Sequence, residues 1–173
     1  YSGKTTALEN VGLDLTLGKS ETKPGSKSIC DWFFYDKGVM LDIDGSAILR
    51  KDGLATDDKV WKTLLRLLQK HRPERPIDGI VLTISATDLI APIEEVREVI
   101  RAKADTIYKK LIQVQVTLGL CVPVYVLVTK CDAIPGFRSF AGALPQQFRD
   151  QMFGWSNPYA LETAFSPRWV DEA

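Results

Sequence analysis

The sequence has 173 residues, of which 45% are hydrophobic and 25% are charged, as in a globular domain rather than a disordered chain. Lysine and arginine together number 22, and aspartate and glutamate also number 22, so no excess charge attracts nucleic acid or an anionic membrane. The longest apolar runs, at 79–85 and 122–128, have the length of buried strands, whereas crossing a bilayer takes about 20 residues. The composition therefore predicts one globular domain and no nucleic-acid partner.

Cysteine and histidine usage argues against a zinc site. Cys30, Cys121 and Cys131 are odd in number and far apart, and they form no C-x-x-C pair. His71 is the only histidine, and it ends a charged stretch with helical spacing. These features predict free thiols in a reducing compartment, and a solvated helix end rather than a catalytic base at His71.

In its first half the sequence predicts a helix, a loop, a hairpin and a second helix. The first helix is expected from Thr5 to Asn10, and the polar stretch 11–30, rich in Gly, Ser, Thr and Lys, is expected to be a mobile loop. Two β-rich runs on either side of 36–38 predict a hairpin. Residues 57–71 predict an amphipathic helix with acids at its start and bases at its end. Its apolar residues lie at helical spacing: Trp61, Leu64, Leu65 and Leu68.

The second half alternates strands and helices. The runs 77–86 and 123–132 are continuously apolar, which predicts strands covered on both faces. Between them, 92–120 predicts a long amphipathic helix after Pro92. A further helix is expected within 145–155. The buried stripe of the long helix is expected to contain Val96, Ile100, Ile107, Leu111 and Val114.

The first candidate site residues follow one another in the stretch G-K-T-T. Gly3, Lys4 and Thr5 fit the end of the phosphate-loop motif G-x-x-x-x-G-K-[ST], whose first glycine would lie before residue 1. Backbone N–H groups at the glycine and at the start of the helix would hold phosphate. Lys4 would reach the β- and γ-phosphates, the Thr5 hydroxyl would bind Mg²⁺, and Thr6 would lie beside it. The alternative is a helix start without a ligand.

The second candidate is D-x-x-G at the end of the predicted hairpin. The Asp42 carboxylate could hold Mg²⁺ through water, and the Gly45 amide could approach a γ-phosphate because glycine has no Cβ. One alternative is a polar strand-to-loop turn. A calcium loop is another superficial match, but the acidic ligands expected downstream are missing.

The third candidate, T-K-x-D, follows the second apolar strand. It fits the [NT]-K-x-D motif that reads guanine in GTP-binding proteins. Asp132 could accept two hydrogen bonds from the base, and the stem of Lys130 could lie along the base plane. Adenine lacks this pair of donors, so the aspartate would favour GTP. Thr129 stands where asparagine is commoner, which leaves ATP open, and a charged strand end without a ligand is the alternative.

Together the three motifs predict a P-loop NTPase fold of the GTPase-like kind. Each motif lies at the carboxyl end of an expected strand, and ligands of open α/β sheets bind along that edge. We therefore expect a three-layer α/β sandwich with a mostly parallel sheet and one antiparallel hairpin. The strand that feeds the phosphate loop would precede residue 1, so the first strand is expected to be missing from this chain.

The predicted domain organisation has two parts. Residues 1–155 form the N-terminally truncated nucleotide-binding domain, and 156–173 form an extension toward the next part of a longer protein. Four aromatic residues at this end are expected to cover the edge of a core rather than to bind a partner. They are Trp155, Tyr159, Phe165 and Trp169.

Most of residues 3–155 resembles the cytoplasmic P-loop domain of the IcmF/TssM family, the inner-membrane component of type VI secretion systems. The resemblance rests on the segments 2–13, 30–45, 60–90 and 123–137. It implies GTP or ATP with Mg²⁺ as ligand, a place on the cytoplasmic face of the bacterial inner membrane, and membrane anchoring through segments outside this chain. It also implies three partners: a second inner-membrane subunit, an outer-membrane lipoprotein and the baseplate.

The chain departs from this family at the magnesium motif, where D-T-A-G-R is usual. Asp44 adds a carboxylate that would repel a γ-phosphate if it pointed inward, and Ser46 is too short to replace a water-orienting glutamine. Arg50 is the nearest arginine that could contact phosphate, and Ser26 or Ser28 could replace the switch threonine. These departures favour binding over hydrolysis.

Two hypotheses of different classes follow. The first is a nucleotide-binding module, which could also hydrolyse nucleotide and so energise or gate a secretion complex. The second is a degenerate P-loop fold that acts as a docking scaffold for other secretion subunits. For the truncated chain itself the sequence predicts weak or no nucleotide binding.

Overall fold

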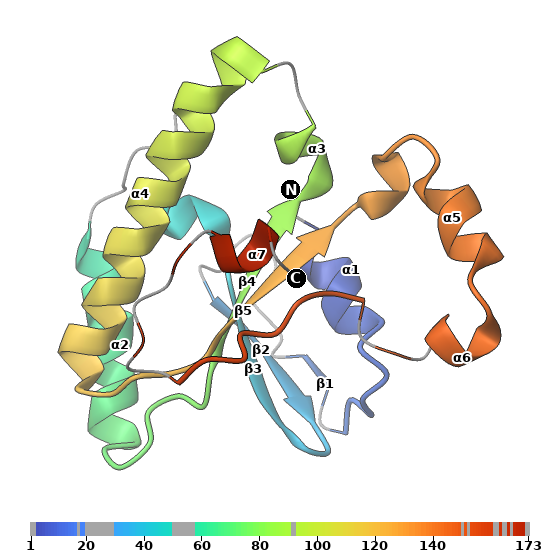
Figure 1. Cartoon of the computed structure of the whole chain (residues 1–173). Coiled ribbons are helices and arrows are strands. Elements are labelled where there is room, and N and C mark those ends of the chain that lie inside the picture. The colour runs from blue at the N-terminus through green and yellow to red at the C-terminus, as the bar shows by residue number, and fades with distance from the viewer. Residues whose placement is uncertain are drawn as a thin grey trace. The chain divides into compact units, whose positions relative to one another are not determined.

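The computed structural model describes residues 3–16, 18–19, 30–49, 58–90, 93–149, 151, 153–160, 163, 166 and 168–171 (Figure 1). The chain divides into two compact units, Tyr1–Ile134 and Pro135–Ala173. The first unit contains all the described strands and the two long helices. The predicted roles of Ser26, Ser28 and Arg50 fall on residues outside those described. The predicted division at 155–156 stays a prediction.

An antiparallel sheet forms from the aromatic hairpin. β2 (Cys30–Tyr35) pairs with β3 (Gly38–Ile43), which confirms the hairpin prediction. β1 (Gly18–Lys19) pairs with the other edge of β2. β1 lies within the stretch 11–30, which was expected to be a loop throughout. Alternation along β2 buries Phe33 and Tyr35, whose rings stack on the same face of the sheet.

A parallel pair forms from the two apolar runs. β4 (Ile80–Ser85) and β5 (Val124–Thr129) run parallel beside each other (Figure 1). Their register places Ser85 opposite Thr129 at the carboxyl ends of the two strands. The expected coverage of β5 on both faces is wrong, because its residues 124–128 are 41–60% exposed. Of the described residues in this pair, Ile80 is the one that packs against the main hydrophobic core.

The described strands form two sheets rather than one mostly parallel sheet. β3 and β4 are not hydrogen-bonded neighbours, so the hairpin sheet and the parallel pair are separate. Three of the five described strands, β1 to β3, form the antiparallel sheet, and the other two form the parallel pair. The α/β class, the parallel pair and the hairpin are confirmed, and the P-loop fold itself stays a prediction.

The hydrophobic core of the first unit lies between the two long helices, which run side by side in Figure 1. α2 (Asp58–His71) confirms the predicted helix within one residue, and α4 (Ile93–Leu118) confirms the long one. No helix among the described residues is long and apolar enough to cross a membrane. The buried core residues are Trp61, Leu65, Val114 and Leu118.

The buried stripe of α4 differs from the predicted one. Thr106 and Lys110 are buried, at 7% and 4% exposure, whereas Ile107 and Leu111 are only half-buried. The fully buried positions run at four-residue spacing through Val114 to Leu118, so the apolar residues at 107 and 111 flank the stripe. The side chain of Val96 lies outside those described.

In the described part of the first unit, four short helices lie near the strand ends. α1 (Lys4–Glu9) confirms the predicted first helix. The 3₁₀-helices η1 (Gly45–Ala47) and η2 (Cys131–Ala133) follow β3 and β5. α3 (Ala86–Leu89), which the sequence analysis did not predict, follows β4 and packs against η2.

Three short helices are found among the described residues of the second unit. α5 (Phe137–Ala143) was not predicted, and the helix expected within 145–155 is only the four residues of α6 (Gln146–Arg149). α7 (Arg168–Asp171) is also four residues long. The rings of Tyr159 and Trp169 lie 4.0 Å apart between centroids, so two of the four tail aromatics pack on each other.

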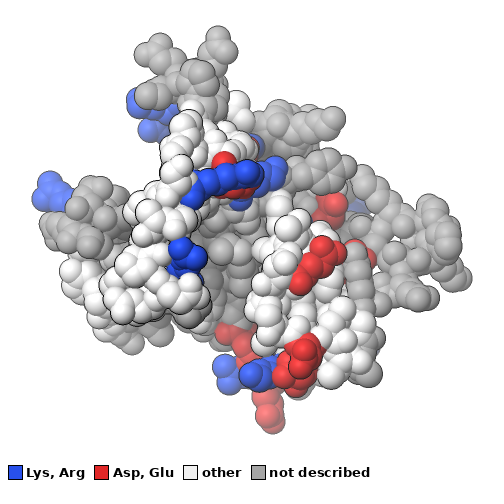
Figure 2. Space-filling model, turned by 90° about the vertical axis from the view of Figure 1, so that its right-hand side faces the viewer, with Lys and Arg blue, Asp and Glu red and all other residues white. Residues whose placement is uncertain are grey.

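His71 is exposed at the end of α2, as predicted. Cys30, Cys121 and Cys131, all within the described residues, form no disulfide. On the face drawn in Figure 2, acidic and basic side chains of the described residues both occur in small groups among uncharged residues.

Candidate functional site

The turn before α1 depends on a glycine. Gly3 has φ 75° and ψ 14°, in the left-handed region that residues with a Cβ rarely adopt, and its carbonyl accepts the first helical hydrogen bond from Ala7 at 3.1 Å. Lys4 therefore begins the helix directly after the turn. Thr5 and Thr6 lie exposed in the first turn of the helix.

The Lys4 side chain reaches across to the end of β3. Its ammonium lies 3.3 Å from Oδ1 of Asp42 and donates a hydrogen bond of 2.9 Å to the carbonyl of Ile43. The Lys4 side chain is 28% exposed and that of Asp42 only 11%, so much of the pair is shielded from water. The first and second sequence motifs are thus in direct contact.

The third motif reaches the same turn through Thr129. A Cβ added to Gly3 would lie 3.4 Å from both Cβ and Oγ1 of Thr129, so the glycine faces this side chain closely. The Thr129 hydroxyl donates a 3.3 Å hydrogen bond to the carbonyl of Ile84, which fixes it to the end of β4. The turn at Gly3 therefore lies over the carboxyl end of the parallel pair.

Lys130 has a strained backbone at the end of β5. Its φ of 56° and ψ of 33° make it the only non-glycine residue with positive φ among the described residues. A left-handed residue with a Cβ costs about 1–2 kcal/mol, and such strain tends to occur at functional sites. Lys130 caps η2, and Asp132 lies within η2, three residues after Thr129.

Relieving this strain should stabilise the chain. We expect the free energy of unfolding of Lys130→Gly to be about 1 kcal/mol higher than that of Lys130→Ala. Both variants lose the lysine side chain, and only glycine accepts this φ without strain. Urea denaturation of the two variants measures the difference. Equal stabilities would mean that the left-handed conformation at Lys130 is not maintained.

The Asp44 carboxylate is hydrogen-bonded within its own turn. Its Oδ1 accepts a 2.7 Å hydrogen bond from the backbone N–H of Ser46, so the carboxylate caps η1. The space beside Gly45 is open on the side where a Cβ would lie.

Two oxygen donors that a magnesium ion could use lie near Lys4. The Asp42 carboxylate lies beside the Lys4 ammonium, and Thr5 carries a hydroxyl in the first turn of α1. Among the described residues no group of three or more His, Cys, Asp and Glu side chains is placed to hold a metal. A magnesium ion at Asp42 would therefore take most of its ligands from water and phosphate, as this metal usually does with nucleotides.

Comparison with known proteins places the chain in a family. The model of the IcmF-related N-terminal domain matches residues 55–173. The chain belongs to the IcmF/TssM family. It is 35% identical over 170 residues to the type VI secretion system component TssM1 of Pseudomonas aeruginosa strain PAO1, an alignment that covers 93% of this chain and 15% of that protein. No solved structure matches the chain significantly.

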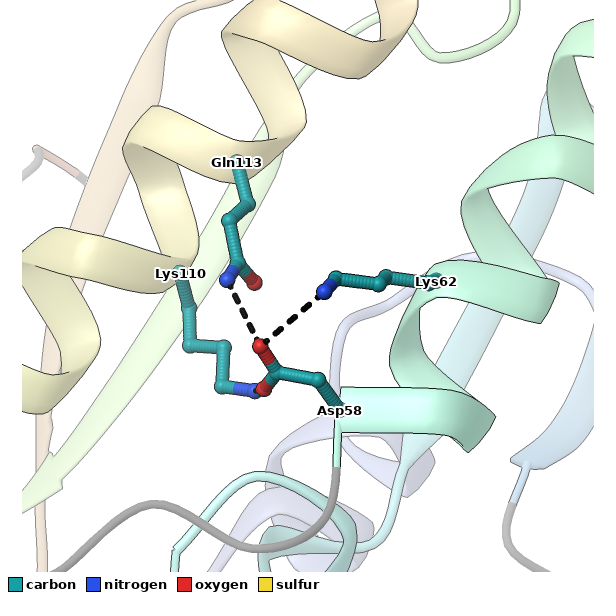
Figure 3. Close-up of polar contacts among 4 residues, drawn as sticks. All are labelled: Asp58, Lys62, Lys110 and Gln113. Carbon is teal, nitrogen blue, oxygen red and sulfur yellow. Dashed lines mark hydrogen bonds and ion pairs between the residues drawn. The ribbon is translucent and has the colours of Figure 1, made fainter.

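This IcmF/TssM chain also has a polar cluster that the sequence analysis missed. Asp58, the first residue of α2, accepts hydrogen bonds from Lys110 and Gln113 of α4, the second at 2.9 Å, and lies 3.6 Å from Lys62 (Figure 3). The hydrogen bond from Lys110, then that from Gln113, lowers the pKa of Asp58 even though burial opposes the shift. The cluster joins the start of α2 to the C-terminal half of α4.

Two polar atoms beside this cluster are buried without a hydrogen-bond partner. They are Nε1 of Trp61 and Oε1 of Gln113.

The sequence alone did not predict the contact between Lys110 and Asp58. The two residues are 52 positions apart, and no periodic pattern relates positions that far apart. An acidic residue at the first position of α2 was the only feature that the sequence analysis could have used.

Proposed function

We propose that this chain is the nucleotide-binding part of a type VI secretion membrane subunit, with a P-loop NTPase fold and a site for GTP or ATP with Mg²⁺. One observation carries the proposal: Lys4 of the first motif contacts Asp42 of the second, and Gly3 lies against Thr129 of the third. These residues come from the start, the first third and the last third of the chain. A phosphate site, a metal site and a base site need this proximity.

Each proposed role follows from the chemistry of its residue. Lys4 would bind the β- and γ-phosphates once its ammonium turns from Asp42, and Thr5 and Asp42 would hold the magnesium, with Thr6 beside them. The amide of Gly45 would meet the terminal phosphate. Ser46 is too short to orient an attacking water as a glutamine does, so the proposal is limited to binding.

The base would bind beyond β5. The strained Lys130 would lie along the base, and the Asp132 carboxylate would accept hydrogen bonds from guanine, with Thr129 holding their loop at the strand end. GTP is therefore the preferred candidate, and ATP is the alternative.

The cellular role is proposed from the family. TssM1 is a type VI secretion component by name, and this chain spans 15% of its length. We assign the chain to the cytoplasmic face of the bacterial inner membrane, with anchoring through segments outside it. Its proposed partners are an inner-membrane subunit, an outer-membrane lipoprotein and the baseplate.

Nucleotide titration of the full-length protein tests the proposal. Lys4→Met should weaken binding of fluorescently labelled GTP in Mg²⁺ by about 100-fold, because it removes the charge that meets phosphate. Lys70→Met, at an exposed position of α2, is the matched control and should bind as the wild type does. Asp132→Asn should shift preference from GTP toward XTP, whose base presents a carbonyl where guanine has its amine.

The outcomes separate the hypotheses. If neither labelled GTP nor labelled ATP binds to the full-length protein with Mg²⁺ present, the nucleotide site is refuted and the docking-scaffold hypothesis takes its place. If both bind but Asp132→Asn leaves the base preference unchanged, the base-reading role of Asp132 is wrong.

A further inference from the structure

The two side chains assigned to phosphate and to magnesium are bound to each other. The Lys4 ammonium contacts Oδ1 of Asp42 and the carbonyl of Ile43, both at the end of β3. The Asp42 carboxylate neutralises the charge with which Lys4 would attract phosphate, so the lysine binds phosphate more strongly once this ion pair has separated. Separation of the pair is therefore coupled to phosphate binding.

Separation leaves a poorly hydrated carboxylate. The Asp42 side chain is only 11% exposed, so water compensates little for the loss of Lys4. Asp31 lies directly opposite Asp42 across the hairpin, and residues paired in this way point to the same face. A free triphosphate would add its negative charges beside this carboxylate, with a second acidic residue across the strand.

A divalent cation removes this obstacle. Mg²⁺ binds carboxylate oxygen readily, and at Asp42 it would occupy the place of the Lys4 ammonium. The lysine would then be released toward the phosphates, and the carboxylate would keep a cation beside it throughout. The same exchange would not occur with a metal-free nucleotide.

We infer that Asp42 selects the magnesium complex of a nucleoside triphosphate over the free nucleotide by holding Lys4 until the metal replaces it. This inference rests on the proposed function and specifies the ligand of that site. It makes Asp42 a specificity-determining residue as well as a metal ligand. It also requires that Lys4 and a metal ion compete for the same carboxylate.

The first test measures the affinity of the full-length protein for labelled GTP in EDTA and in excess Mg²⁺. The wild type should bind at least about 100-fold more tightly with Mg²⁺. Asp42→Asn should bind about 10-fold more tightly than the wild type in EDTA, since Lys4 is no longer held by a carboxylate, and its gain from Mg²⁺ should fall below about 10-fold. Asp36→Asn, in the exposed hairpin turn, is the matched control and should behave as the wild type.

The second test uses no nucleotide. Lys4→Met should bind Mn²⁺, detected by electron paramagnetic resonance, at least about 10-fold more tightly than the wild type, because the competing ammonium is absent. Lys4→Arg keeps the competing charge and should bind Mn²⁺ as weakly as the wild type. This test also holds if Asp42→Asn fails to fold.

The failures are distinguishable. Wild-type binding that depends on Mg²⁺, together with unchanged affinity of Asp42→Asn in EDTA, would overturn the inference and leave the proposed function standing. Equal Mn²⁺ affinity of the wild type and Lys4→Met would also overturn it. A wild type that binds no nucleotide in either condition would refute the proposed function and this inference with it.

Discussion

Asp58→Ala should lower the free energy of unfolding by about 2–4 kcal/mol, because it leaves the Lys110 ammonium buried without the carboxylate that neutralises it. Lys110 is 4% exposed, so water cannot replace the lost partner. Urea denaturation at neutral pH measures the effect. The double variant Asp58→Ala with Lys110→Met should recover most of the loss, since it removes both charges and keeps the length of the buried side chain.

A surface ion pair offers the control for this measurement. Asp78 pairs with Arg75, and their side chains are 62% and 72% exposed, so Asp78→Ala should change the unfolding free energy by less than about 1 kcal/mol. Equal losses from Asp58→Ala and Asp78→Ala would mean that Lys110 does not depend on its buried partner.

The same pair should make stability depend on pH. The hydrogen bonds from Lys110 and Gln113 lower the pKa of Asp58 in the folded state, so the unfolded chain takes up the proton first as the pH falls. The stabilisation is fully present above the ordinary carboxyl pKa of about 4 and is lost as the pH falls through the lower, folded value. The stability difference between the wild type and Asp58→Ala should therefore shrink below about pH 4. A constant difference down to about pH 2.5 would contradict this.

Local patterns predicted most of the elements but not how they pack. The hairpin, α2, α4 and the two parallel strands follow from apolar periodicity and turn residues, which depend only on neighbouring positions. α3 and α5 were missed because they are four and seven residues long, too short to show a helical period. The burial of Lys110 depends on Asp58, 52 positions away, and a single helix pattern contains no information about that partner.

In the candidate site, too, the sequence predicted the positions of residues along the chain but not all of their contacts. Motif chemistry placed Lys4, Asp42 and Thr129 at the ends of neighbouring elements, and the structure brings Lys4 to Asp42 and Gly3 to Thr129. Motif chemistry did not predict that Lys4 and Asp42 pair with each other, because it assigns each of them a partner from the ligand. It also did not predict that Asp44 caps its own turn, since a side chain's direction depends on backbone angles that the motif leaves open.

Leu65→Ala should be the other strongly destabilising change, with a loss of about 2–4 kcal/mol in the free energy of unfolding. Leu65 is 2% exposed and lies in the core between α2 and α4, so truncation removes buried contacts and leaves a cavity. Leu67→Ala is the matched control, because Leu67 is on the same helix and is 49% exposed. It should change the unfolding free energy by less than about 0.5 kcal/mol.

This core also supports the candidate site, because Ile43 packs against it and the carbonyl of Ile43 accepts the hydrogen bond from Lys4. A cavity at Leu65 should therefore loosen the end of β3 as well as α2. We expect faster amide hydrogen exchange at residues 41–43 in Leu65→Ala than in Leu67→Ala, beyond the increase that the lower global stability explains. If exchange there rises only with global unfolding, the core does not position the acceptor of Lys4, and the site depends on the hairpin alone.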